Sequence, residues 1–330
     1  VSSGRHDAFS AITSRKQHGR PVLVRFEESG PDGDCRWHAK APFGEKIRNT
    51  VSRADASGFF TVRQQGAAGQ TIPVEIRDTV LVVSLNSKTK AFADKRVRQA
   101  INMCIDRHAG LKKLAKITFT APRPSGYLLY DTFYALPDEE LYKIPGFQKD
   151  IAASRKKAMQ MLKEAGAEGL EFTYSNRAVS HPYDHIAIWL MSEWKKCGLK
   201  PKMITNPTSK FVKIRREGGF DATIDWAPSF LPDPTLMHFK YISADRTASN
   251  YSKNTDRGLD KLFDAQKGEV DKNKRKAVVH EFEKTALENA WVLPITYTDR
   301  VIALNSKVKG YVIANSHILN NTWRGVYLDN

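Results

Sequence analysis

Strand-like and helix-like segments alternate along this chain from residue 79 to about residue 300. Thr79–Asn86 (TVLVVSLN) is a continuous apolar run that ends in polar residues, which is typical of a strand buried on both faces. The next segment carries apolar side chains at three- and four-residue spacing from Val97 to Ile105, and Asp94 is placed to cap that helix. Because Leu170–Asn176 then alternates as a second strand, the sequence predicts an α/β fold with a largely parallel or mixed sheet.

The rest of this region continues the pattern. We expect helices near Tyr183–Lys196, Leu259–Gln266 and Lys274–Asn289, and strands near Gly198–Asn206 and Asp221–Trp226. Residues 118–148 are rich in Pro, Gly and Tyr and predict a long irregular excursion. Residues 1 to about 70 contain short strand-like pieces, but their periodicity is weak and supports no fold prediction.

The segment DWAPSFLPDPT (Asp225–Thr235) combines a tryptophan with three prolines at positions 228, 232 and 234. Proline fixes φ and disfavours the helical conformation in the residue before it. The segment is therefore predicted to be a rigid, extended loop and not a helix. Such a loop suits the wall of a binding site, and it equally suits an ordinary ordered connection.

Composition narrows the classes of function. The chain carries 52 Lys and Arg against 36 Asp and Glu, a formal charge of +16, but the basic residues are spread over its whole length. No RNA-binding motif, zinc-finger spacing or helix-turn-helix is present, so we expect a solvated basic surface and no nucleic-acid partner. No apolar run approaches the roughly 18 to 20 residues of a membrane helix. Because the chain begins at Val1, we interpret it as a mature form or a fragment.

The three cysteines, Cys35, Cys104 and Cys197, are odd in number and have no CxxC spacing. This favours neither a disulfide framework nor a cysteine-based zinc site. Cys104 and Cys197 occupy helix-like positions, where we expect them to be small packing residues.

Catalytic motifs are absent from the sequence. His181 and His185 have a spacing that suits one metal ion, but the glutamate of HExxH is missing and Pro182 indicates a helix start instead. No nucleophile elbow, Walker loop or dinucleotide fingerprint occurs. The acids Asp138–Glu140, Glu281 and Glu283 are interpreted as helix caps and solvated surface. We therefore expect no catalytic residue, no metal and no cofactor.

Several segments, in this order, resemble the extracellular solute-binding proteins of family 5, the dipeptide- and oligopeptide-binding components of ABC importers. They are VSLNSKTKAFADKRVRQAINMCIDR, SRKKAMQMLKEAGAEGLEFTYSN, GGFDATIDWAPSFLPDPT, NYSKNTDRGLDKLFDAQ and HEFEKTALENAWVLPITYTDRVIALNSKVKGY. Together they cover about residues 79 to 313. Their ordered occurrence is far more specific than any one of them.

The resemblance implies a two-lobe clamshell of the type II periplasmic binding proteins, with one lobe nearly complete and the other partial. Residues 1–80 would be a partial lobe I or a divergent N-terminal segment, 81–297 the α/β lobe II, and 298–330 a return segment to lobe I. The strands VLVVSLN and DRVIALN would form the hinge. Family chains are longer ahead of the RVRQA helix, so this chain resembles a form truncated at its N-terminus.

In peptide-binding members a WxxD pattern supplies the acid that pairs with the ligand's ammonium. Counting from Trp226, that position is Ser229 here, while Asp233 matches the acid of a structural DP turn. Either Asp233 substitutes for the acid, or the ligand lacks a peptide-like N-terminus. The resemblance implies a ligand site that includes Trp226, Ala227, Ser229, Asp233, Tyr127, Tyr130 and Asn250.

The implied function is that of a periplasmic, or extracellular and membrane-associated, receptor that binds its solute without chemistry. The solute is expected to be peptide-like, or an opine or modified amino acid. The expected partners are this ligand and the ABC permease subunits, with the receptor itself a monomer. The alternative is a hydrolase that acts on a small ester or peptide in the same cleft.

Overall fold

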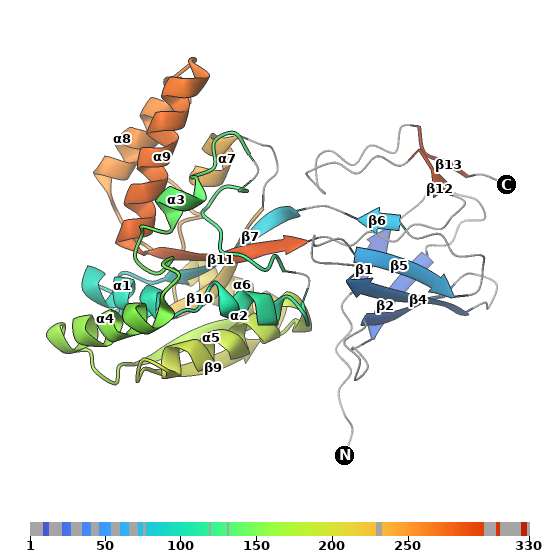
Figure 1. Cartoon of the computed structure of the whole chain (residues 1–330), viewed down its shortest axis with the longest axis horizontal. Helices are drawn as coiled ribbons and strands as arrows, with labels where there is room; N and C mark the ends of the chain where they lie inside the picture. Colours follow the sequence, from blue (N-terminus) through green and yellow to red (C-terminus); the bar gives the residue numbers. More distant parts are fainter. Residues whose placement is uncertain are drawn as a thin grey trace. The chain divides into compact units, whose positions relative to one another are not determined.

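The computed structural model shown in Figure 1 describes residues 77–118, 120–130, 132–228, 233–299, 308–310 and 325–328, and the backbone of six strands between residues 9 and 74. Residues 77, 78, 181, 228, 299 and 328 are described as backbone only. The chain divides into two compact units. Residues 1–76, 300–314 and 321–330 form unit 1, and residues 77–299 and 315–320 form unit 2.

Unit 1 contains antiparallel sheets. Its six-stranded sheet follows the chain order: β1 (Phe9–Ile12), β2 (Val22–Glu27), β3 (Cys35–Lys40), β4 (Lys46–Arg53), β5 (Phe60–Gln65) and β6 (Ile72–Val74). A second sheet pairs β12 (Val308–Lys309) with β13 (Tyr327–Leu328). Each strand of the larger sheet pairs with its neighbour in sequence, which is a meander that short connections allow.

Unit 2 is built on one five-stranded mixed sheet. Its strand order is β11 (Val292–Asp299), β7 (Arg77–Leu85), β10 (Ala222–Pro228), β8 (Glu171–Arg177) and β9 (Lys200–Asn206). β7 is antiparallel to both of its neighbours, whereas β10, β8 and β9 are mutually parallel. The predicted α/β fold with a mixed sheet is therefore confirmed. The irregular excursion also lies where it was expected, with one short helix, α3 (Asp138–Leu141), inside it.

Helices cover both faces of this sheet. α1 (Lys95–Met103), α2 (Ala109–Leu114), α4 (Ile151–Glu164) and α5 (His185–Lys195) contribute to one apolar cluster, and α7 (Pro234–His238), α8 (Arg257–Gly268) and α9 (Lys272–Asn289) contribute to the other. Figure 1 shows α8 and α9 on one side of β7 and β11, with α1 and α4 on the other side. The apolar run of β7 serves both clusters, because Leu81 and Val83 join the first and Val80 and Val82 the second. The first cluster thus lies on one face of the sheet, the α1/α4/α5 face, and the second lies on the other, the α8/α9 face.

Local signals set the helix ends, and the predicted cap at Asp94 is confirmed. Asp94 caps α1 by accepting a hydrogen bond from the backbone N–H of Arg96 at 2.8 Å. The helix α6 (Thr208–Glu217) stops at Gly218, whose φ of 80° is readily adopted only by glycine. The helix expected at Tyr183–Lys196 begins earlier, with a π-helical turn, η1 (Ser180–Asp184), that leads into α5.

Two sequence predictions require correction. Cys104 and Cys197 form a disulfide, with Cα atoms 6.1 Å apart across 93 residues of sequence, so the expectation of unbridged packing residues was wrong. Both are nonetheless buried as expected, because they follow the neighbouring helices α1 and α5 into one apolar cluster. The proline-rich segment is also not wholly extended, because Pro234 is the first residue of α7, a position where its missing N–H costs nothing.

None of the helices that the structure describes combines the length and the apolar composition that crossing a bilayer requires.

Candidate functional site

Two of the predicted site residues, Trp226 and Ala227, lie at the carboxyl edge of the unit 2 sheet. The parallel strands β8, β9 and β10 end there at Arg177, Asn206 and Pro228. β11 runs parallel to β10 and ends at Asp299, while β7 begins beside it at Arg77. The chain connections to unit 1 at residues 76–77 and 299–300 therefore leave from this edge. In open α/β sheets the carboxyl ends of the strands are where ligands bind.

Trp226 and Ala227 lie next to the end of β10. Trp226 pairs in register with Leu81 and is half-buried, with its ring packed against the apolar cluster of the α1/α4/α5 face. Ala227 points to the opposite face, where it is buried. Ser229, the next predicted contact, lies outside the described residues. The partly exposed indole therefore offers an apolar surface at the strand end.

Asp225, the residue before Trp226 in β10, is a buried acid that the sequence analysis did not include among the site residues. Asp225 is 1% exposed, and its carboxylate is paired with two cations, Arg215 from α6 and Lys240 from the segment after α7. Both cations also lie over the ring of Tyr251, at 4.5 and 4.7 Å from its centroid. Burial lowers the pKa of Lys240, while the neighbouring Asp225 opposes that shift. We call Arg215, Asp225 and Lys240 the charged trio.

A further cation, Arg177, ends β8. Its Nε donates to Thr208 Oγ1 at 3.0 Å, and its Nη1 donates to the hydroxyl of Tyr183 at 3.3 Å. Burial raises the pKa of Tyr183, and the charges of Arg177, Asp225 and Arg215 also act on it. Tyr183 thus lies within electrostatic reach of Arg177 and of two members of the charged trio.

Asp233 is held within the protein as a brace. Its side chain caps α7 through the backbone N–H of Thr235 at 2.8 Å. Both carboxylate oxygens also accept from the guanidinium of Arg275, each at 3.0 Å. Burial alone would raise the pKa of Asp233, but the hydrogen bonds from Arg275 and Thr235 outweigh it and hold the pKa below its usual value.

Tyr127, Tyr130 and Asn250 have partners inside unit 2. Tyr127 is 1% exposed, stacks on Tyr241 at 4.0 Å between ring centroids, and donates its hydroxyl proton to Val292 O. Asn250 is buried and donates to the carbonyl oxygen of Ile242 at 2.7 Å. The ring of Tyr130 is half-buried and carries the guanidinium of Arg123 at 4.1 Å from its centroid. Their role in ligand contact stays a prediction.

Glu283 corrects another interpretation, because it is not a solvated surface acid. Its side chain is fully buried, and it accepts hydrogen bonds from the backbone N–H groups of Tyr127 and Leu128. The loop that contains Gly126 and Tyr127 lies so close to Glu283 that a Cβ at Gly126 would collide with its carboxylate. Burial raises the pKa of Glu283 to about 7, although the backbone hydrogen bonds act in the opposite direction. Glu281, in contrast, is exposed as expected.

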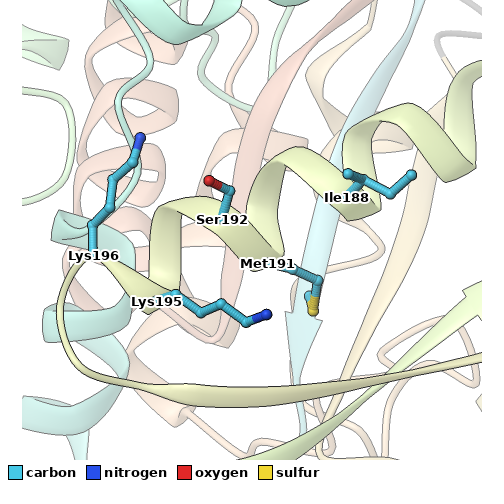
Figure 2. Close-up of a pocket in the computed structure, with 5 residues that line it drawn as sticks. All are labelled: Ile188, Met191, Ser192, Lys195 and Lys196. Carbon is cyan, nitrogen blue, oxygen red and sulfur yellow. The ribbon is translucent and has the colours of Figure 1, made fainter.

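A hollow lies on the exposed side of α5, away from Trp226. It has a volume of about 550 Å³ and is lined by Ile188, Met191, Ser192, Lys195 and Lys196, which Figure 2 shows along a single helix. None of the predicted site residues lines it. Within the described parts of the chain, no three His, Cys, Asp or Glu side chains are grouped as a metal site would require.

The charged trio could be found from sequence only through two weak signals. Asp225 is the one charged residue in the mostly apolar strand ATIDWAP, and Lys240 follows the mostly apolar segment LMHF. Each signal indicates a buried charge that needs a partner, but neither names that partner. Arg215 lies on a helix with several other basic residues and carries no distinguishing signal.

Comparison with known proteins gives this site its context. The model of the bacterial extracellular solute-binding proteins, family 5 Middle, matches residues 51–248. A dipeptide-binding protein of Pseudomonas aeruginosa is 24% identical over 79% of this chain and 48% of its own length. A probable deoxycholate-binding periplasmic protein of Escherichia coli is 27% identical over 78% of this chain and 48% of its own.

Solved structures agree on the fold. The murein tripeptide-binding protein MppA of Escherichia coli superposes with a TM-score of 0.67 at 22% identity, over 77% of this chain and 49% of that one. The chain thus spans about half the length of the relatives it matches. Because the family model covers more than half of the residues, the conclusion is direct: this chain belongs to the bacterial extracellular solute-binding proteins of family 5.

Proposed function

We propose that this protein is the solute-binding receptor of an ABC importer, located in the periplasm or at the outer surface of the cell. It captures a peptide-like, opine or otherwise modified amino-acid solute and delivers it to permease subunits in the membrane. The observation that carries the proposal is the position of Trp226. Its half-buried indole lies at the carboxyl edge of the sheet, where β7 begins at Arg77 and β11 ends at Asp299.

The residues at this edge bind and do not react. Trp226 supplies an apolar surface, and the backbone groups at Ala227 and Ser229 supply hydrogen bonds to the solute. Asp233 braces the loop, because Arg275 and Thr235 already engage its carboxylate. Capture follows from a difference in affinity, since a solute that binds one conformation better than another shifts the population toward it.

The experiment is native mass spectrometry of the purified chain, followed by denaturation to release any retained solute. We expect a small molecule that is present under native conditions and lost on denaturation. The variant Trp226→Ala should lower the retained fraction about tenfold, as expected for the loss of a buried aromatic contact.

The matched control is Trp291→Ala. Trp291 is likewise half-buried, but it immediately precedes β11 and so lies at the opposite edge of the sheet. Retention that falls equally in both variants, or that is absent from the wild-type protein, contradicts the proposed function.

A further inference from the structure

The last strand of the unit 2 sheet, β9, pairs on one side only. Its partner is β8, and among the described residues no strand continues the sheet beyond it. Lys200 N donates to the carbonyl oxygen of Leu170, and Asn206 O accepts from the segment after β8, so both residues turn their backbone groups inward. Because these groups alternate in direction along a strand, Met203 and Thr205 point theirs outward. The outward groups form a template for an added strand.

Both faces of β9 carry an exposed apolar side chain beside this outer side. Met203 pairs in register with Tyr174, which is buried on the α1/α4/α5 face. Met203 therefore lies on that face, and it is 38% exposed. Ile204 points to the opposite face and is 43% exposed. A strand paired with β9 would cover part of both side chains, because cross-strand neighbours lie in contact.

The hollow of α5 extends the apolar surface on one of these faces. Residues 196–199 connect α5 to β9, and the two elements are in contact, side by side in Figure 1. Ile188, which is 59% exposed, and Met191 line the hollow. Figure 2 shows Met191 and Lys195 on one side of the helix and Lys196 on the other. Its volume of about 550 Å³ is large enough to accept apolar side chains from an added strand.

Two lysines give this surface an unbalanced positive charge. Lys195 lines the hollow, and Lys202 lies on the same face of β9 as Ile204. Neither has an ion-pair partner within the described parts of the chain, whereas Lys196 is engaged by Glu193. Each face of β9 thus combines an exposed apolar side chain with an unpaired lysine. An acidic segment meets a complementary field here, and a basic segment is repelled.

We propose that the outer side of β9 and the hollow of α5 dock an extended, acidic segment of a partner protein, which adds to the sheet as a further strand. Its backbone pairs with the outward groups of Met203 and Thr205, its apolar side chains enter the hollow, and its carboxylates pair with the two free lysines. Pro201 has no N–H to offer, so the pairing is confined to the second half of β9. None of the predicted solute contacts belongs to α5 or β9, so this inference does not depend on the proposed function.

The first test compares two fluorescein-labelled peptides. Val-Glu-Val-Val-Glu-Val, when extended, presents one glutamate on each face, and Val-Lys-Val-Val-Lys-Val reverses the charge. Fluorescence anisotropy measures their affinities for the purified chain. We expect the acidic peptide to bind at least about tenfold more tightly. Equal binding of the two peptides, or no binding of the acidic peptide at about 1 mM, overturns the inference.

A charge reversal in the hollow assigns the binding to this surface. Lys195→Glu should weaken binding of the acidic peptide about tenfold, because it replaces an attractive contact by a repulsive one. The matched control is Lys261→Glu, which makes the same change at an exposed position of α8, on the other face of the sheet. The control should retain the affinity of the wild-type protein. Equal weakening in both variants would show attraction to the overall charge and contradict docking at α5.

Strand addition itself is tested at Met203. Its N–H points away from β8, so Met203→Pro removes a donor that the sheet does not use. We expect this variant to bind the acidic peptide at least about tenfold more weakly than Met203→Ala, which keeps the N–H. In the wild-type protein, bound peptide should also slow amide hydrogen exchange at Met203 and Thr205 about tenfold, as measured by NMR. This second measurement decides the matter if the proline variant does not fold, and binding without slower exchange overturns strand addition.

A second copy of this chain is the other candidate occupant of the outer side of β9. Sedimentation velocity of the wild-type protein and of Met203→Pro distinguishes it from an acidic partner. We expect both proteins to sediment as monomers. A wild-type dimer that Met203→Pro dissociates would assign the surface to self-association and overturn the inference.

Discussion

Each face of the unit 2 sheet buries one glutamate, but the two side chains have different partners. On the α1/α4/α5 face, Glu193 is 2% exposed and pairs with Arg155 and Lys196, each at 2.6 Å. On the α8/α9 face, Glu283 is fully buried, and the described residues provide it with backbone N–H donors and no cation. The comparison teaches that burial alone does not decide the charge of a carboxyl group. Its partners do.

Among the differences between the two faces, the disulfide should have the largest effect on stability. Cys104 and Cys197 cross-link the α1/α4/α5 face, and the described residues show no such link on the other face. A cross-link across 93 residues restricts the unfolded chain, so the double variant Cys104→Ala/Cys197→Ala should lose about 4 kcal/mol of unfolding free energy. Urea denaturation measures this loss. As a control, a reductant should lower the free energy of unfolding of the wild-type protein and leave that of the double variant unchanged. If the two proteins have equal free energies of unfolding without reductant, the cross-link does not stabilise the fold.

The next effect is the pH dependence of the α8/α9 face. The pKa of Glu283 is raised from 4.5 to about 7, so the folded protein binds this proton more tightly than the unfolded chain. Its stabilising contribution is complete below about pH 4.5 and is lost as the pH rises through about 7. We expect this loss to reach about 3 kcal/mol.

The variant Glu283→Gln isolates that effect, because the amide keeps an acceptor oxygen and does not titrate. Unfolding free energies of both proteins at about pH 5 and about pH 8 give the comparison. The rise in pH should lower the free energy of unfolding of the variant by less than that of the wild type. A pH dependence identical in the two proteins would mean that Glu283 does not hold its proton as proposed.

The same substitution on the other face should act differently. Glu193→Gln removes the carboxylate from Arg155 and Lys196, and we expect a loss of about 2 kcal/mol at neutral pH because hydrogen bonds to charged groups are lost. The control is Glu171→Gln, whose pair with Lys200 is largely exposed and should contribute less than about 1 kcal/mol. If Glu193→Gln loses no more unfolding free energy than this control, the ion pairs of Glu193 do not account for the difference between the two faces.

The smallest effect should be equal on both faces. Asp150 caps α4 through the N–H of Ala153, and Asp271 caps α9 through the N–H groups of Asn273 and Lys274. Each substitution by alanine should cost about 1 kcal/mol, because both caps are exposed and satisfy end donors of a long helix. Thermal denaturation should therefore give similar shifts. Unequal shifts would extend the difference between the faces from their interiors to their surfaces.

Much of unit 2 could be predicted, because its signals are local. The apolar run of β7, the cap at Asp94 and the stop at Gly218 each depend on neighbouring residues alone. Unit 1 gave only weak local signals, short strand-like pieces that supported no fold prediction, since antiparallel strands depend on their partners and on alternation. At the site, the placement of Trp226 beside the carboxyl edge followed from the strand that precedes it.

The chain order and type of the elements in unit 2, and the family to which the chain belongs, were determined by the sequence itself. Only the tertiary structure decided which charges and which thiols meet. Asp225 takes its cations from two different segments, Glu283 meets a loop more than 150 residues away, and Cys104 meets Cys197 across 93 residues. Periodicity records which face of an element is buried, but a buried group's charge and reactivity depend on atoms that distant parts of the chain bring to it.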